Sequence, residues 1–271
     1  MNTLFNKSSL GLASYIEKNQ VLSQLMDTRP DFLRSRLHFV HLAANETIYN
    51  EGDRVNYVYF PLDSVVSSLA VLRDGATVEI AMFGKDSVIG LSSVFGPRVN
   101  QYWTRMCLGG RLAKMDVEDL IVAFAENKQV AKIILQSYLS LVTQISQRSV
   151  CHAKHSVMER FCCWLLMIHD RVNDGSFRLT QELVASRLGT RRAGITVAAR
   201  TLFDEKAVEY KRGLLRIKDR ESIERYACEC YPVVSIHTDA VAQPTVLQPS
   251  RAVVLPIDPA RRFVPGRVGG V

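Results

Sequence analysis

The pattern of hydrophobic and polar positions first predicts a β-rich domain. From about Phe39 to Met115, short runs rich in Val, Ile, Tyr and Phe alternate with turn signals. Turns that recur every ten or so residues between short strands are typical of a compact antiparallel barrel or roll. Asp74-Gly75, between "SSLAVLR" and "ATVEIAMF", predicts a tight hairpin. Residues 14–37, which precede this stretch, favour short helices.

A helical period then replaces the strand pattern over residues 126–152. Apolar residues recur there every three or four positions and form one stripe over more than four turns. The stripe consists of Val130, Ile134, Tyr138, Leu141 and Ile145. A long single helix between two domains is a common place for two subunits to meet. We therefore predict that this stripe is a dimer interface, and the alternative is that it packs on its own domain.

The next segment has the pattern of two short helices joined by a turn. A helix over about residues 154–172 precedes "LTQELVASRLGTRRAGITVAARTL", which begins at Leu179. Thr180 is a candidate N-cap for the first short helix, and Gly189 falls where a tight turn needs a residue that tolerates positive φ. The second short helix begins near Arg191. Its apolar arc consists of Ile195, Ala198, Ala199 and Leu202.

The opposite arc of the second short helix suits a DNA groove. The planar fork of Arg192 matches guanine O6 and N7, and the small side chains around it allow close approach. Downstream, "AVEYKRGLLRI" predicts a hairpin whose basic turn would contact phosphates as a wing. The predicted DNA-contacting residues are Thr180, Arg191, Arg192, Thr196, Arg200, Lys211 and Arg212. The alternative is a solvated amphipathic helix with arginines for solubility.

The charge distribution agrees with a polyanionic partner. The chain of 271 residues has a net charge of +7, and residues 178–225 hold 12 Lys and Arg against 7 Asp and Glu. Most of the positive excess therefore lies around the paired helices. No stretch approaches the roughly 18 apolar residues of a membrane span, and the N-terminus lacks a secretory signal, so we expect a cytoplasmic protein without membrane contact. The proline-rich residues 232–271 predict a disordered tail.

The six cysteines do not form paired C-x-x-C sets, which argues against a zinc ribbon or a disulfide framework. Cys162 and Cys163 are interpreted as small buried thiols. Among Cys151, His152 and His155, only the first and last share a helix face, and a metal site there is the alternative. We expect no metal, no cofactor and no catalytic activity, because no nucleophile elbow, P-loop or metal-ligand spacing is present.

Four segments carry a resemblance to a known family: "VYFPLDSVVS", "HSVMERFCCWLLMIHDRV", "LTQELVASRLGTRRAGITVAARTL" and "YACECY". Over about residues 15–231 the chain resembles the Crp/Fnr superfamily of bacterial transcription regulators. The resemblance implies an α+β fold with an antiparallel, cyclic-nucleotide-binding-type β-roll over residues 15–125. A dimerisation helix over residues 126–152 and a winged helix-turn-helix over residues 153–231 would follow.

The resemblance also implies how DNA is bound. A homodimer would bind a partly palindromic site in double-stranded DNA, with its two recognition helices one DNA turn apart. Arg192 falls on the base-reading arginine of the family, whereas Ala193 stands where well-studied members carry a base-contacting glutamate. The resemblance therefore implies an operator sequence that differs from that of the well-studied members. RNA polymerase would be a further partner if the protein is an activator.

The effector pocket implied by the family is degenerate in this chain. Cyclic-nucleotide binders hold the ribose with a Gly-Glu pair and the phosphate with Arg-Ser or Arg-Thr. The corresponding residues here are Gly90, Leu91, Gln101 and Tyr102. A leucine accepts no hydrogen bond from ribose, and a glutamine lacks the charge-assisted pair of arginine with phosphate. We therefore expect no cyclic AMP binding, and the alternative is a shifted register that uses Arg98 or Arg105.

Other effectors are not defined by the sequence. An iron–sulfur cluster held near the N-terminus is not expected, because no cysteine precedes Cys107. Haem ligation by His38, His41 or Cys107 stays open, and so does the identity of any small-molecule effector. The leading hypothesis is a sequence-specific transcription regulator. The alternative is a cyclic-nucleotide- or metabolite-responsive sensor that acts through protein contacts.

Overall fold

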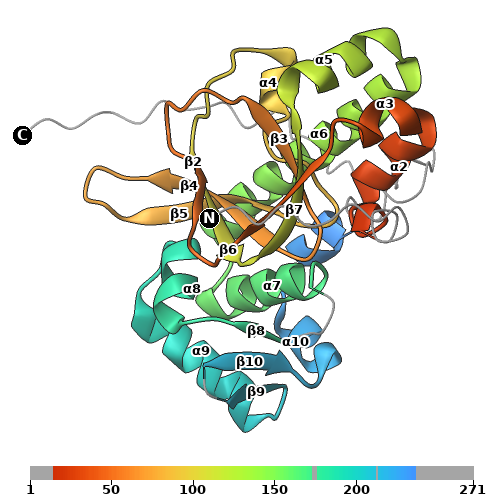
Figure 1. The fold of residues 1–271 in the computed structure, drawn as a ribbon. Coiled ribbons are helices and arrows are strands. Elements are labelled where there is room, and N and C mark those ends of the chain that lie inside the picture. The colour runs from red at the N-terminus through yellow and green to blue at the C-terminus, as the bar shows by residue number, and fades with distance from the viewer. Residues whose placement is uncertain (1–14, 173–175, 212, 236–271) are drawn as a thin grey trace, which may run out of the picture.

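The computed structural model describes residues 15–172, 176–211 and 213–235, and its N-terminal domain contains the predicted β-roll (Figure 1). The strands of the roll are β1 (His38–Leu42), β2 (Thr47–Tyr49), β3 (Tyr57–Pro61), β4 (Val65–Val71), β5 (Thr77–Phe83), β6 (Trp103–Leu108) and β7 (Gly110–Asp116). They form two antiparallel sheets in the orders β1-β7-β3 and β2-β6-β4-β5. Alternate residues such as Val58 and Phe60 are fully buried, because successive side chains of a strand point to opposite faces. The roll predicted from the strand pattern is confirmed.

Short helices cover the roll. They are α2 (Gln20–Thr28), α3 (Pro30–Arg34), α4 (Ser92–Phe95) and α5 (Val117–Glu126). Asn19 caps α2 by accepting from the backbone N–H of Leu22 at 2.9 Å, and its amide donates to the carbonyls of Pro61 and Ser87. One buried side chain therefore both starts the helix and fixes it to the roll.

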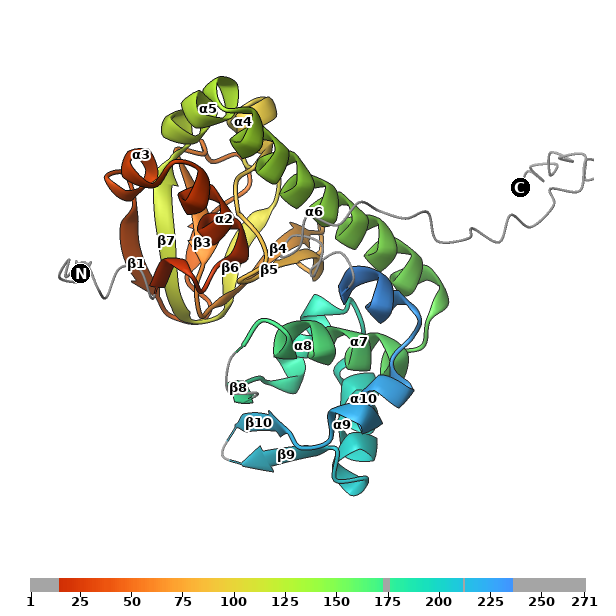
Figure 2. The same ribbon diagram turned by 90° about the vertical axis from the view of Figure 1, so that its right-hand side faces the viewer.

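The long helix α6 (Lys128–Lys154) runs from the roll to the C-terminal domain (Figure 2). The next helix, α7 (Val157–His169), begins three residues later than the helix expected over residues 154–172. The later start has a local cause, because Ser156 and Glu159 form a capping box that sets the first turn of α7.

The predicted dimer stripe lies largely inside its own subunit. Val130 and Ile134 are fully buried in the core shared with α2 and α5. Leu141 and Ile145 are half-buried against the roll, and the ring of Tyr138 lies 5.1 Å from that of a phenylalanine in α4. A side chain enclosed by its own subunit presents no surface to a partner. The assignment of Val130 and Ile134 to a dimer interface is therefore corrected. Both residues are apolar because they pack in the core of their own subunit.

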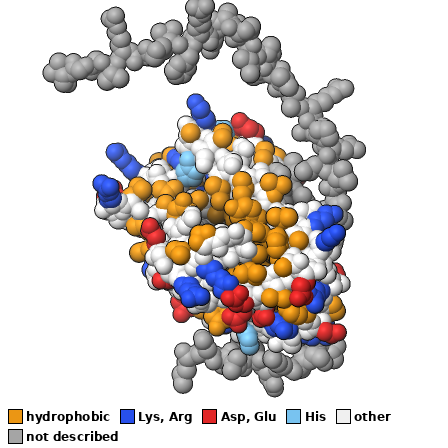
Figure 3. All heavy atoms as spheres, turned by 90° about the horizontal axis from the view of Figure 1, so that it is seen from above, with side chains coloured by type: hydrophobic (Ala, Val, Ile, Leu, Met, Phe, Trp, Pro, Cys, Tyr) orange, Lys and Arg blue, Asp and Glu red, His pale blue; other side chains and the backbone are white. Residues whose placement is uncertain are grey.

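A second apolar row of α6 is exposed instead. It consists of Leu135, Leu139, Val142 and Val150, and the first two are 51% and 55% exposed. These residues recur at helical spacing, like the buried row, but on another face. Exposed apolar side chains also occur on neighbouring helices, at Phe95 and Val122. Seen from above, where α4 and α5 lie, hydrophobic side chains gather in a patch (Figure 3).

The C-terminal domain is the predicted winged helix-turn-helix. Its elements after α7 are β8 (Ser176–Arg178), α8 (Gln181–Arg187), α9 (Arg192–Asp204), β9 (Val208–Lys211), β10 (Leu214–Ile217) and α10 (Arg220–Tyr226). The three strands pair antiparallel in the order β8-β10-β9. A further helical turn covers residues 230–235, so the first residues of the expected tail are helical. Residues 236–271 of that tail lie outside the described residues. In the described part of the chain, no helix is both long enough and apolar enough to cross a membrane.

Candidate DNA interface

The turn between α8 and α9 has the geometry that the sequence predicts. The Thr180 hydroxyl caps α8 by accepting from the backbone N–H of Leu183 at 3.1 Å. Gly189 has φ +56°, and a Cβ there would lie 3.0 Å from Val78 in the β4–β5 hairpin. The turn therefore requires glycine both for its left-handed backbone and for its contact with the roll. Arg160 of α7 supports the turn by donating to the carbonyl of Leu188 at 3.2 Å.

Helix α9 buries one face and exposes the other. Ile195, Ala198 and Leu202 are buried, as their helical spacing predicts. A Cβ at Gly194 would lie 3.3 Å from Val157, so the small residue lets α9 pack closely on α7. On the outer face Val197 is 68% exposed. This burial pattern leaves the predicted base-reading face open to solvent.

The arginines of this segment divide into exposed and buried groups. Arg191 stands at the N-cap position of α9 and Arg192 is its first residue, and both are exposed. The described residues provide no salt bridge to either. Arg200 lies 3.7 Å from Asp204 as a solvent-exposed pair, which constrains it little. Arg187 is only 5% exposed and therefore does not contribute to the basic surface.

Thr196 is held by a residue that the sequence analysis missed. Its hydroxyl lies 2.7 Å from Oε1 of Gln181, at the start of α8, and 3.1 Å from the carbonyl of Arg192. The single hydroxyl proton is therefore already engaged within the protein, so donation to DNA would require its release. The position of Gln181 in the first turn of α8 is the only sequence signal for this contact.

The wing is the β9–β10 hairpin. Lys211 pairs with Leu214 in the β9–β10 register, and Gly213, which precedes Leu214, has φ +77°. Lys211 is the last residue of β9 and is exposed. Arg212 lies outside the described residues. The hydroxyl of Tyr210 donates to the carbonyl of Leu179, which ties the wing to the segment before α8.

The four residues assigned to an effector pocket lie in different environments. Gly90 has φ +90°, and a Cβ there would lie 3.2 Å from the carbonyl of Tyr57. Leu91 is buried in the core of the roll, whereas Gln101 and Tyr102 are exposed just before β6. Leu91 therefore offers neither a polar group nor a surface to a ribose.

A buried polar network joins the roll to α6 and α7. Glu79 of β5 is fully buried and accepts from Nε1 of Trp164 at 2.9 Å and from the hydroxyl of Ser67. The guanidinium of Arg148 lies 3.3 Å from the same carboxylate. A direct contact from the roll to α8 is the 2.5 Å hydrogen bond between the hydroxyls of Thr77 and Ser186. The β-roll thus contacts the DNA-binding domain at several points.

A β-roll, a long connecting helix and a basic winged helix-turn-helix define a DNA-binding transcription regulator. Residues 39–127 match the model of the cyclic nucleotide-binding domain, and residues 159–226 match that of the Crp-like helix-turn-helix domain. The chain belongs to the Crp/Fnr family of transcription regulators.

A curated relative is similar over most of the chain, and solved structures share the fold. A global nitrogen regulator of Nostoc sp. is 22% identical over 190 residues, which are 67% of this chain and 85% of that protein. FixK2 from Bradyrhizobium japonicum has a TM-score of 0.63 at 19% identity and covers 71% of this chain and 98% of its own. The c-di-GMP responsive regulator CLP of Xanthomonas campestris has a TM-score of 0.53 at 16% identity, covering 69% of this chain and 96% of its own. At these identities the solved structures show the fold alone.

Proposed function

We propose that the protein is a homodimeric regulator that reads a partly palindromic DNA sequence through the exposed face of α9. The observation that carries the proposal is the pair Arg191 and Arg192 at the exposed N-terminal end of this helix. In helix-turn-helix proteins the N-terminal residues of the second helix contact base edges in the major groove. No residue of this interface suggests a catalytic role.

Different residues would make different kinds of contact. Arg192 suits a bidentate bond to guanine, and Val197 suits an apolar contact with a thymine methyl. Arg191 lies about 100° away around the helix and is better placed for the backbone. Lys211 at the end of β9 and Arg212, the next residue in the sequence, would bind phosphates, and such contacts position the protein without reading sequence. Thr196 serves mainly to hold α9 on α8.

The dimer interface is the exposed apolar row of α6. Leu135, Leu139 and Val142 lie on the helix that connects the two domains, and the row continues to Val150. A contiguous exposed apolar surface of this kind marks an association site. A second copy of the chain is the occupant that we assign to it, because two recognition helices held one DNA turn apart are needed to read two half-sites.

The experiment that tests this function is selection of bound sequences from a random duplex library, with the full-length protein as bait. We expect an enriched motif with two inverted half-sites whose centres lie about 10–10.5 base pairs apart. Enrichment of a single half-site would contradict the dimeric arrangement. Failure to retain any duplex at low salt would contradict DNA binding itself and favour a sensor that acts through protein contacts.

A further inference from the structure

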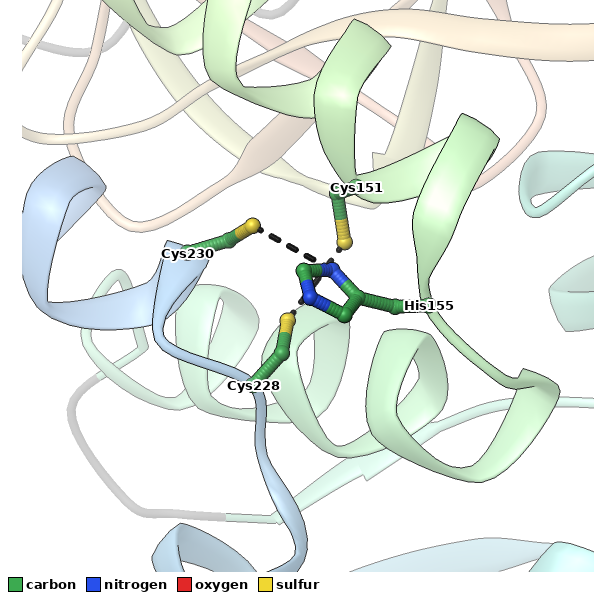
Figure 4. A group of neighbouring side chains, drawn as sticks. All are labelled: Cys151, His155, Cys228 and Cys230. Carbon is green, nitrogen blue, oxygen red and sulfur yellow. Dashed lines mark hydrogen bonds between the residues drawn. The ribbon is translucent and has the colours of Figure 1, made fainter. Parts of the chain in front are cut away.

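Four potential metal ligands from two segments distant in the sequence converge where the end of α6 meets the segment after α10. Cys151 and His155 stand one turn apart at the end of α6, and Cys228 and Cys230 follow α10. Their sulfur and nitrogen atoms all lie within 4.8 Å of one another, and the four side chains point toward a common centre (Figure 4). The two segments are separated by the whole winged helix-turn-helix in the sequence.

We propose that Cys151, His155, Cys228 and Cys230 form a structural zinc site. The sulfurs of Cys151 and Cys228 are 3.5 Å apart, and the sulfur of Cys230 lies 3.4 Å from Nδ1 of His155. A tetrahedral ion with Zn–S bonds of about 2.3 Å and a Zn–N bond of about 2.05 Å places neighbouring ligand atoms about 3.6–3.8 Å apart. Two of the distances between ligand atoms are therefore already near the edge length of a coordination tetrahedron, and the others are at most 4.8 Å, so a small closure would complete it.

The surrounding groups have the arrangement expected around a bound ion. Nε2 of His155 lies 3.3 Å from the carboxylate of Glu229, which leaves Nδ1 to face the sulfurs. A histidine that ligates a metal commonly donates its other N–H to a carboxylate in this way, which fixes the ring and its tautomer. The side-chain amide of Gln147, one turn before Cys151, donates to the sulfur of Cys230 at 3.0 Å. Such a bond favours the thiolate form that metal binding requires.

The geometry also distinguishes this site from other uses of cysteine. A disulfide has an S–S length of about 2.05 Å, and all six cysteines are free thiols. A cluster of several irons would hold its ligands apart by its own width, whereas these ligand atoms surround the space of a single ion. Three sulfurs and one imidazole nitrogen are a ligand set that zinc prefers. The three cysteines are buried and the His155 side chain is only 11% exposed, so no open position for a substrate remains.

A zinc ion at this site would cross-link the two ends of the DNA-binding domain. Zinc would displace the thiol protons and join the last turn of α6 to the segment after α10. All the elements from α7 to α10 lie between the paired ligands in the sequence. The ion would therefore set how the winged helix-turn-helix sits on the long helix, at a point distinct from the DNA-contacting face.

Metal analysis of the tag-free, full-length protein purified under reducing conditions tests this proposal. We expect about one zinc per chain in the wild type and close to none in Cys228→Ser and Cys151→Ser. The matched control Cys107→Ser, which changes a buried thiol of the roll, should retain zinc. Chelator treatment should lower the unfolding midpoint of the wild type but leave that of Cys228→Ser unchanged, and this comparison holds whether or not DNA binding survives.

Cobalt reconstitution provides a second readout of the same site. Co²⁺ added to the chelator-treated wild type should give the intense d–d absorption of a tetrahedral ion together with thiolate-to-cobalt charge transfer. His155→Ala should lose or shift these bands, and Cys107→Ser should preserve them. Stoichiometric iron in place of zinc, or the absence of both bound metal and the cobalt spectrum, would overturn the proposal.

Discussion

Removing the carboxylate of Glu79 should uncouple the roll from α6 and α7. The carboxylate is fully buried and lies 3.3 Å from the guanidinium of Arg148, itself only 8% exposed, and 2.9 Å from Nε1 of Trp164. Glu79→Ala would leave a buried cation without its counter-charge and an indole N–H without an acceptor. Breaking one partner of a buried ion pair costs about 3–5 kcal/mol. For a protein of this size, such a loss lowers the unfolding midpoint by about 6–20 °C.

A double-mutant cycle separates the ion pair from general packing. Arg148→Met should also cost about 3–5 kcal/mol, because it leaves the buried carboxylate unpaired. In the double variant Glu79→Ala/Arg148→Met both charges are gone, and the main residual polar defect is the unpaired N–H of Trp164, worth about 1–3 kcal/mol. The double variant should therefore be more stable than either single variant. If the two sites were independent, the losses of stability of the single variants would instead add to about 6–10 kcal/mol.

The assay for the cycle is urea unfolding of the four proteins, followed by far-UV circular dichroism and by tryptophan fluorescence, to which Trp164 contributes. If the double variant loses as much stability as the sum of the two single variants, the network does not couple the domains and the reasoning is refuted.

Three further predictions concern other parts of the molecule. Leu139→Glu should give monomers in sedimentation, because it places a charge in the exposed apolar row of α6 on each subunit. The control Gln129→Glu adds an exposed charge elsewhere on the same helix and should leave dimers. Dimers that persist in Leu139→Glu would show that the interface lies elsewhere. Cyclic AMP should show no micromolar binding by calorimetry, since Leu91 is buried and apolar; measurable heat would contradict the degenerate pocket. Burial and then the charge of Arg220 lower the pKa of His169, so the unfolded chain binds more protons below about pH 6.5 and stability is lost as the pH falls through that value. The stability lost between pH 7 and pH 5 should be smaller in His169→Gln, and an unchanged loss would show that this histidine is not responsible.

The roll and the helix-turn-helix were predictable because their signals are local. Turn residues such as Asp74-Gly75 and the cap at Thr180 act within a few positions of themselves, and the buried arc of α9 follows a helical period. The dimer interface was harder to predict from the sequence, because α6 carries two apolar rows. The sequence pattern does not say which row its own domain covers, and the row of Val130 and Ile134 proved to be the covered one.

The contacts between distant segments could not be predicted. Cys151 and His155 were recognised as one helix face, but Cys228 and Cys230 lie more than 70 residues further on. No C-x-x-C spacing links the two pairs, and only the fold brings them together. The buried role of Glu79 could not be predicted for the same reason, since Arg148 and Trp164 lie on α6 and α7, far from β5 in the sequence.

The central claim is that α9 reads DNA sequence through Arg192, and binding isotherms on the selected operator and on a scrambled duplex, each at two salt concentrations, test it most directly. Arg192→Ala should weaken the free energy of binding to the operator by about 1–3 kcal/mol and reduce the difference in affinity between the operator and the scrambled duplex. Lys211→Ala should weaken both duplexes alike and reduce the salt slope by about one unit, because it removes a phosphate contact. Arg34→Ala removes the same charge from α3, at the end of the molecule away from α9, and should change neither (Figure 1). If Arg192→Ala weakens operator and scrambled duplex equally, α9 does not read sequence through this residue and the account is contradicted.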